Sequence, residues 1–247
     1  MLKSAIEKLL EIVFNPYIED GEFKKEYVEQ EKNNIKQKIE GKIDNKARYA
    51  LNRCIEEMYK DEPFGLFKFG DIEDLEGIDG KNLYEYYQSL IKNCKIDIFV
   101  SGIVPDNIEQ LIEENENIAK LQERQADYVI PAITKKETNQ KENIVTESME
   151  VTQGKLVLGL DINLENEEQK YDALLYNSIL GGTANSKMFQ NVREKAHLAY
   201  VASSSYSRQK SNIFINCGIE IANYEKALEI VKKQIEDMKN GDFTEED

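Results

Sequence analysis

The chain has 247 residues, of which 40% are apolar, and its 47 acidic and 32 basic residues give a formal net charge of -15. This length can supply one large domain or two ordinary ones with separate cores, and two is the better expectation. The negative charge disfavours nucleic acid as a partner, because a sequence-independent grip on phosphates needs clustered Lys and Arg. A soluble acidic surface, or a field that attracts basic or extended peptides, explains it instead.

The cysteines and the longest apolar stretches indicate the compartment. Cys54, Cys94 and Cys217 lie far apart without a CxxC pair, so we expect no disulfide framework and a reducing, cytoplasmic environment. No apolar stretch approaches the roughly 18 residues that a membrane span requires, and the first residues lack the layout of a signal peptide. The expectation is a soluble chain without a membrane partner.

Apolar residues at helical spacing predict four helices in the first part of the chain. The first runs through Ile6–Val13 and ends before Asn15-Pro16. The others are expected at 27–39, 47–58 and 83–91.

Alternation then replaces helical spacing. Ile96, Ile98 and Val100 predict a strand, and a helix at 108–112 follows it, which gives a helix-strand-helix unit on a sheet. From 123 to 149 the sequence is polar, charged and aperiodic, as is typical of a connector.

A second α/β unit is predicted after the connector. It begins with an alternating strand at 156–160 and a helix at 171–179 that ends at Gly181-Gly182. The remaining elements are a short helix at 185–195, strands at 200–208 and 212–220, and a helix at 224–238. Because the chain enters in a helix and stops after one, we expect an excerpt of a longer protein.

Three familiar kinds of active site are disfavoured by the residues present. His197 is the only histidine, and neither HExxH nor HxxEH occurs, so it receives no metal role. Ser203, Ser204 and Ser205 lack a GxSxG elbow and are interpreted as an exposed strand with small polar side chains. Gly181-Gly182 lacks the context of a phosphate loop. We therefore predict no catalytic residue and no metal ligand.

The segment Leu180–Tyr200, LGGTANSKMFQNVREKAHLAY, resembles the hallmark of the second domain in pitrilysin/insulinase-type peptidases. Those enzymes have a glycine turn, a short helix with an Arg, and a Tyr seven residues later. Arg193 and Tyr200 have this spacing, and the resemblance implies that they bind the substrate backbone or stabilise an oxyanion. The alternative is structural: Arg193 pairs with a surface carboxylate and Tyr200 packs in a core.

The resemblance extends upstream over most of the chain. The segments that carry it are Asn15-Pro16, Phe23, Glu31-Lys32-Asn33, Glu62-Pro63-Phe64-Gly65 and Ser101-Gly102. It implies an α+β fold of two homologous layered units, each an antiparallel or mixed sheet covered by helices, and both truncated. Residues 1–122 would be the end of a first domain, 123–149 the connector, and 150–247 the start of a second, inactive and substrate-binding domain.

The zinc site of such enzymes would be incomplete here. The resemblance places HxxEH before residue 1 and the third ligand seven residues after Glu31, where this chain has Lys38. An ammonium group has no lone pair to offer a metal, so Lys38 marks a degenerate zinc-ligand position. Glu40 could replace it only after a two-residue shift, which turns a helical side chain by roughly 200 degrees.

Within this family, the chain is most similar to the non-catalytic subunits of small bacterial paralogues associated with elongation-factor-P modification. The segments at 155–156, 223–224 and 240–243 support that placement. The resemblance implies a peptidase homologue that holds no cofactor, binds extended peptide, and pairs with a zinc-bearing homologous subunit or with itself. Two alternatives stay open: an active zinc endopeptidase whose HxxEH lies upstream, and a scaffold without peptide binding.

Overall fold

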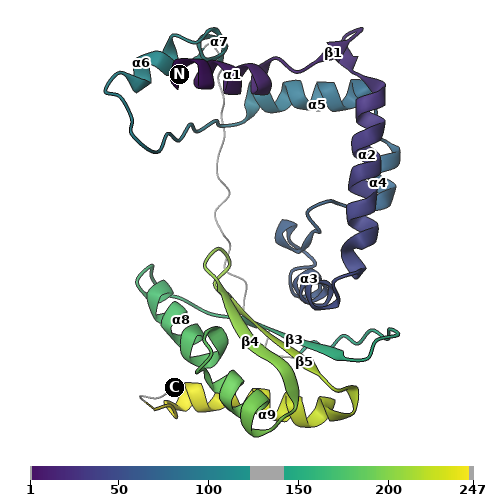
Figure 1. Ribbon diagram of the computed structural model, residues 1–247, viewed down its shortest axis with the longest axis vertical. Helices are drawn as coiled ribbons and strands as arrows, with labels where there is room; N and C mark the ends of the chain where they lie inside the picture. Colours follow the sequence, from purple (N-terminus) through teal and green to yellow (C-terminus); the bar gives the residue numbers. More distant parts are fainter. Residues whose placement is uncertain (1, 123–141, 245–247) are drawn as a thin grey trace. The chain divides into compact units, whose positions relative to one another are not determined.

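The protein is described by a computed structural model that covers residues 2–122 and 142–244 (Figure 1). It folds as two compact units between which the chain alternates. The first unit comprises Met1–Ile39 and Asp71–Lys135, and the second comprises Glu40–Gly70 and Lys136–Asp247. A segment from the first part of the chain is therefore built into the second unit.

The first unit is mainly helical. Its described elements are α1 (Leu2–Phe14), β1 (Ile18–Glu19), β2 (Glu22–Phe23), α2 (Lys25–Glu40), α4 (Ile72–Glu76), α5 (Gly80–Asn93), α6 (Ile108–Glu113) and α7 (Glu116–Gln122). The hairpin β1–β2 lies on α5, where Phe23 meets the ring of Tyr84 edge-on at 5.4 Å. Any side chain at Gly80 would place a Cβ 2.3 Å from the Phe23 carbonyl oxygen, so only glycine permits this approach.

The predicted strand at 96–100 is wrong for this structure. Residues 95–100 form no strand, and Phe99 is 92% exposed. A strand needs a neighbour to receive its backbone hydrogen bonds. Among the described residues of this unit, the strands are β1 and β2, which pair with each other. The helix-strand-helix unit predicted there is therefore absent from the described part, although its helix at 108–112 is confirmed by α6.

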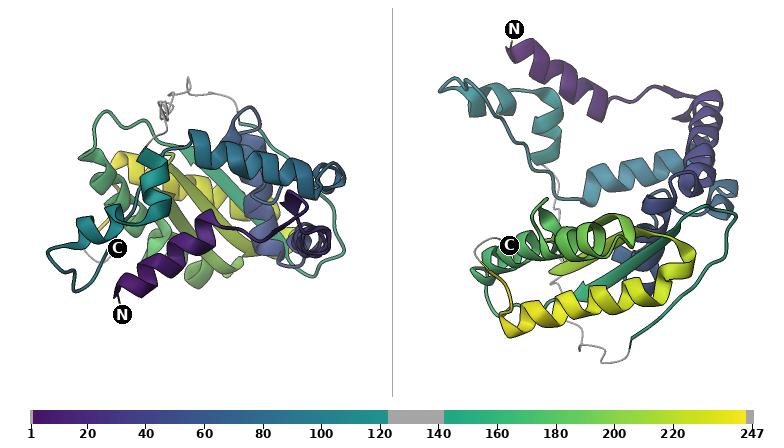
Figure 2. Two further views of the ribbon diagram at one scale, coloured as in Figure 1. Left: turned by 90° about the horizontal axis from the view of Figure 1, so that it is seen from above. Right: turned by 60° about the horizontal axis from the view of Figure 1, so that its bottom comes forward.

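The second unit is built on an antiparallel sheet in the order β3-β5-β4. Its strands are β3 (Gly154–Asp161), β4 (Ala199–Ser207) and β5 (Asn212–Ile219). One face packs on α9 (Tyr224–Asn240), seen along the sheet in Figures 1 and 2, and forms the main core. This core includes Leu180, Met188, Val192, Ile213, Ile215, Cys217, Ala227 and Val231. The predicted strands and the last helix are confirmed.

The other face of the sheet is contacted by α3 (Lys46–Met58). Alternate strand residues point to opposite faces, so Gly159 points away from the core side of Leu158 and Leu160. A Cβ at Gly159 would lie 2.7 Å from the Met58 sulfur and 3.2 Å from that of Cys54. The missing side chain lets α3 lie close against β3.

The predicted connector and domain bounds are only partly covered. Residues 123–141 lie outside the described residues, and 142–149 form no helix or strand. The division into domains at 1–122 and 150–247 stays a prediction, because the compact units describe packing and not ancestry. In the described part of the chain, no helix is both long and apolar enough to cross a bilayer.

Candidate functional site

A β-bulge places Tyr200 at the edge of the described sheet. Ala199 pairs with Ile219 while Val201 pairs with Gly218, so Tyr200 is the extra residue of β4. A bulge at a sheet edge re-aims the side chain that it carries. Tyr200 is 75% exposed, whereas its neighbour Ala199 is buried. The local backbone therefore presents a phenol to solvent, and the alternative that Tyr200 packs in a core is wrong.

Arg193 lies on the π-helix η4 (Phe189–Lys195) and faces the same side as Tyr200. The helix is held by Met188 and Val192, which are both fully buried in the core. The guanidinium carbon of Arg193 is 4.5 Å from the ring centroid of Phe189 and 6.0 Å from that of Tyr200. Cation–π attraction of this kind orients a guanidinium without using up its hydrogen-bond donors.

Arg193 also has a carboxylate neighbour. Its Nε lies 3.4 Å from Oε1 of Glu194, and both side chains are substantially exposed. A surface ion pair of this kind contributes little to stability. The surface pairing considered for Arg193 is therefore present, together with the contacts to the two rings.

A pocket of about 270 Å³ lies beside Arg193 and Tyr200. It is lined by the glycine turn at Gly181-Gly182, which ends the π-helix η3 (Ser178–Gly182), and by Phe189, Arg193, Tyr200 and Ala202. A Cβ at Gly181 would lie 2.6 Å from the backbone nitrogen of Ser204. Glycine is thus required for the turn to lie against β4 and form the pocket wall.

A second pocket of about 350 Å³ shares Arg193 and Tyr200 with the first. Its lining is more polar and includes Glu194, His197 and Glu220. His197 is exposed, with a left-handed φ of 54°, which agrees with its interpretation as a surface residue. The Arg193–Tyr200 pair therefore borders two pockets next to a free strand edge of the described sheet.

The serine run is not uniformly exposed. Ser204 is buried, and its hydroxyl donates to Oδ1 of Asn177 at 2.8 Å, whereas Ser205 is exposed. The prediction of an exposed strand is therefore wrong for Ser204. Asn177 belongs to α8 (Gln169–Asn177), so this hydrogen bond fastens the helix before the glycine turn to β4.

Lys38 and Glu31 are both exposed on α2. Seven residues make about two turns, so the two side chains lie on one face of the helix. Glu31 accepts a hydrogen bond from Nδ2 of Asn34 at 3.2 Å. Within residues 2–122 and 142–244, no group of three or more His, Cys, Asp or Glu side chains is arranged so that it could hold a metal ion. That Lys38 marks a degenerate zinc-ligand position stays a prediction, and its ammonium group has no lone pair to offer a zinc ion.

Phe189 was missed by the sequence interpretation, although it lies four residues before Arg193 in a predicted helix. Residues at this spacing are neighbours on a helical surface, so the signal was available.

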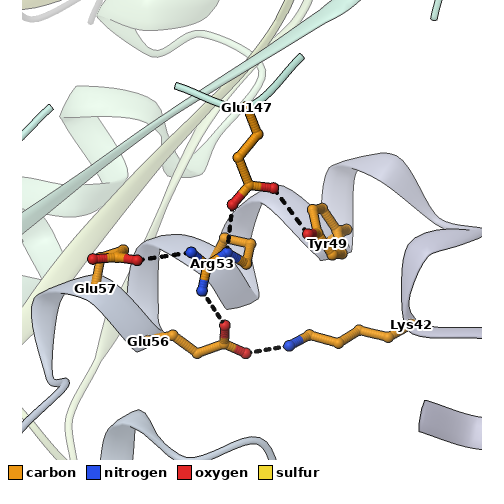
Figure 3. A network of polar contacts seen from close by, with 6 residues as sticks. All are labelled: Lys42, Tyr49, Arg53, Glu56, Glu57 and Glu147. Carbon is orange, nitrogen blue, oxygen red and sulfur yellow. Dashed lines mark hydrogen bonds and ion pairs between the residues drawn. The ribbon is translucent and has the colours of Figure 1, made fainter. Parts of the chain in front are cut away.

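A polar network around α3 was also missed, because Glu147, which two of its members contact, lies 94 residues after Arg53 (Figure 3). Arg53 donates to Glu147 at 2.6 Å, to Glu56 at 2.6 Å and to Glu57 at 2.7 Å, while Tyr49 donates to Glu147 at 2.9 Å. The hydrogen bonds from Arg53 and Tyr49 lower the pKa of the Glu147 carboxyl. The network fastens the segment around residue 147 to α3.

Several known proteins are similar to this chain. Residues 77–247 match a family model described as the peptidase M16 inactive domain. The whole chain is 38% identical to the probable inactive metalloprotease YmfF of Bacillus subtilis (strain 168), of which it covers 57%. It is 26% identical, over 82% of its length, to the uncharacterized zinc protease YmxG of the same organism, of which it covers 47%.

A solved structure supports the fold. The crystal structure of a conserved protein from Enterococcus faecalis V583 matches with a TM-score of 0.88 and 28% identity, over 99% of this chain and 57% of that one. The predicted α+β fold class is confirmed, whereas the homology of the two units stays a prediction. The chain spans about half the length of the curated relatives it matches.

Proposed function

Because this chain belongs to the M16 peptidase family and matches its inactive domain, we propose that it is a non-catalytic peptidase homologue that binds extended peptide at the Arg193–Tyr200 pair. The observation that carries the proposal is the location of this pair: Tyr200 lies on a bulge of the edge strand β4, Arg193 lies beside it on η4, and both line two pockets.

The edge of β4 supplies the means of holding a peptide backbone. In the described sheet this strand has a neighbour on one side only, and an extended peptide can add to such an edge by main-chain hydrogen bonds. The guanidinium of Arg193 and the hydroxyl of Tyr200 are hydrogen-bond donors suited to peptide carbonyls. The first pocket, with Phe189, Ala202 and two glycines in its wall, suits an apolar side chain of that peptide.

The formal charge of -15 gives the protein a preference for basic peptides. Such a field raises the rate at which basic peptides encounter the protein, and salt screens the effect.

A zinc-bearing homologous subunit is the partner that we propose. This chain has Lys38 where the family resemblance requires a ligand, so zinc and the general base would come from the other subunit. The similarity to a probable inactive metalloprotease and to a zinc protease of one organism supports such a division of roles.

Peptide binding by the 247-residue chain tests the proposal. Fluorescence anisotropy would be measured with short fluorescein-labelled peptides, and the tightest binder would then be used for all variants. Arg193→Ala should raise Kd about tenfold or more, since a charge-assisted hydrogen bond contributes about 1.5–3 kcal/mol. Tyr200→Phe, which keeps the ring and removes one donor, should raise Kd about fivefold.

Arg208→Ala is the matched control, because it removes the same charge from the turn after β4, outside the lining of either pocket. Because salt screens an exposed charge outside the site, the Kd of this variant should stay within about twofold of the wild-type value. Equal affinities for Arg193→Ala and wild type would refute the proposed site. A chain that binds none of the peptides would favour the scaffold alternative.

A further inference from the structure

A part-buried polar contact connects η4 to α9. Nδ2 of Asn191 donates to Oε1 of Gln234 at 2.6 Å, and Gln234 is only 3% exposed. The amide of Gln234 is itself oriented, because its Nε2 donates to the backbone oxygen of Ile230 at 3.3 Å. Both Gln234 and Ile230 belong to α9, so the acceptor for Asn191 is held in place.

Apolar core residues flank both partners of this contact along the chain. Met188 and Val192 on one side, and Val231 and Met238 on the other, are buried members of the same core. Apolar contacts are non-directional, so they allow a short helix to slide or turn. A buried hydrogen bond has one geometry and is costly to leave unmade. The Asn191–Gln234 bond therefore adds one directional contact to the burial of Met188 and Val192, which holds η4 in the core.

Asn191 also closes the wide turn of the π-helix. Its backbone oxygen accepts from the backbone nitrogen of Ala196 at 3.2 Å, five residues on, and its Oδ1 accepts from Nζ of Lys195 at 3.1 Å. Arg193 lies inside this turn. π-Helical turns are rare in proteins, and those that occur are frequently found at functional sites. Gln234 thus holds the side chain of Asn191, and the backbone of Asn191 closes the turn that contains Arg193.

We propose that Gln234 is a positioning residue for the peptide site: through its hydrogen bond to Asn191 it fixes the π-turn that directs Arg193 toward Phe189 and Tyr200. The inference rests on the proposed function, because it concerns the same site. Because Gln234 is only 3% exposed, its role is to position Arg193 and not to contact a peptide.

The direct test observes Arg193 without any peptide. In a nuclear magnetic resonance spectrum of the full chain, the Arg193 Nε–H signal would be assigned by its loss in Arg193→Ala. Ring currents of Phe189 and Tyr200 should displace this signal from its random-coil position. In Gln234→Met, which keeps the volume and removes the acceptor, the signal should move toward the random-coil position. An unmoved signal overturns the proposal.

Peptide affinity gives the second readout. Gln234→Met should raise Kd about fivefold to tenfold in the wild-type background and by less than about twofold in the Arg193→Ala background. Val231→Ala, a buried change on the same helix, should lower the urea midpoint and leave Kd unchanged. An equal rise of Kd with and without Arg193 overturns the positioning role. Should Arg193→Ala alone leave Kd unchanged, the proposed function fails instead, and the resonance still decides the role of Gln234.

Discussion

The phenol of Tyr59 joins the segment Glu40–Gly70 to the sheet of the second unit. Tyr59 is 4% exposed, its hydroxyl donates to Oδ1 of Asp161 at 2.8 Å, and it accepts from Nδ2 of Asn212 at 2.7 Å. Asp161 and Asn212 are paired in register at one end of β3 and β5. Burial raises the pKa of Tyr59, so the hydroxyl keeps the proton that it donates.

Tyr59→Phe removes both hydrogen bonds with little change of volume. The bond to the Asp161 carboxylate is worth about 1.5–3 kcal/mol, and the Asn212 amide, which is fully buried, is left without its acceptor at a cost of about 1–3 kcal/mol. The two contributions share one hydroxyl and do not add fully, so we expect a loss of about 2–4 kcal/mol in the free energy of unfolding.

Urea unfolding, followed by circular dichroism and tyrosine fluorescence, measures this loss. The control is Tyr171→Phe, which removes a hydroxyl from a tyrosine that is 66% exposed and should change stability by less than about 0.5 kcal/mol. If Tyr59→Phe also changes the free energy of unfolding by less than about 0.5 kcal/mol, the phenol does not hold the segment to the sheet and the reasoning is wrong.

Three further predictions concern other contacts of the second unit. Glu147→Gln should lower the urea midpoint at pH 7. The hydrogen bonds to Glu147, that from Arg53 first, lower the pKa of its carboxyl in the folded state. The difference in urea midpoint between the variant and the wild type should therefore shrink as pH falls below about 4 and should not shrink as pH rises. Gly181→Ala places a Cβ 2.6 Å from the Ser204 nitrogen and should cost about 1–3 kcal/mol in urea unfolding, together with weaker peptide binding; no loss of either would show that the turn can relax freely. The buried Cys217 thiol, whose pKa is raised by burial to about 12, should react with a thiol dye only as the chain unfolds, and rapid labelling of the native chain would contradict its burial.

Periodicity predicted most of the elements because their patterns are local. The stripes at 27–39 and 47–58 predicted α2 and α3, and the strands predicted at 156–160, 200–208 and 212–220 match β3 to β5 within one or two residues. Alternation at 96–100 failed because a strand also needs a pairing partner, and periodicity says nothing about one.

The candidate site was predictable where its signal is local and hidden where it is not. Arg193 and Tyr200 were found from one short segment, and the structure brings their side chains together. The π-turn was expected only as a short helix, since its geometry involves Gln234, 43 residues after Asn191. The contact of Tyr59 with Asn212 spans 153 residues, and no pattern in either segment indicates it.

The most direct test of a peptide-binding chain that does not cut is to follow binding and cleavage in one sample. The 247-residue chain would be incubated with its best fluorescein-labelled peptide, with and without a chelator, while anisotropy reports binding and mass spectrometry reports cleavage. We predict an intact peptide and a Kd that the chelator leaves unchanged. Cleavage that the chelator stops and added zinc restores would contradict it.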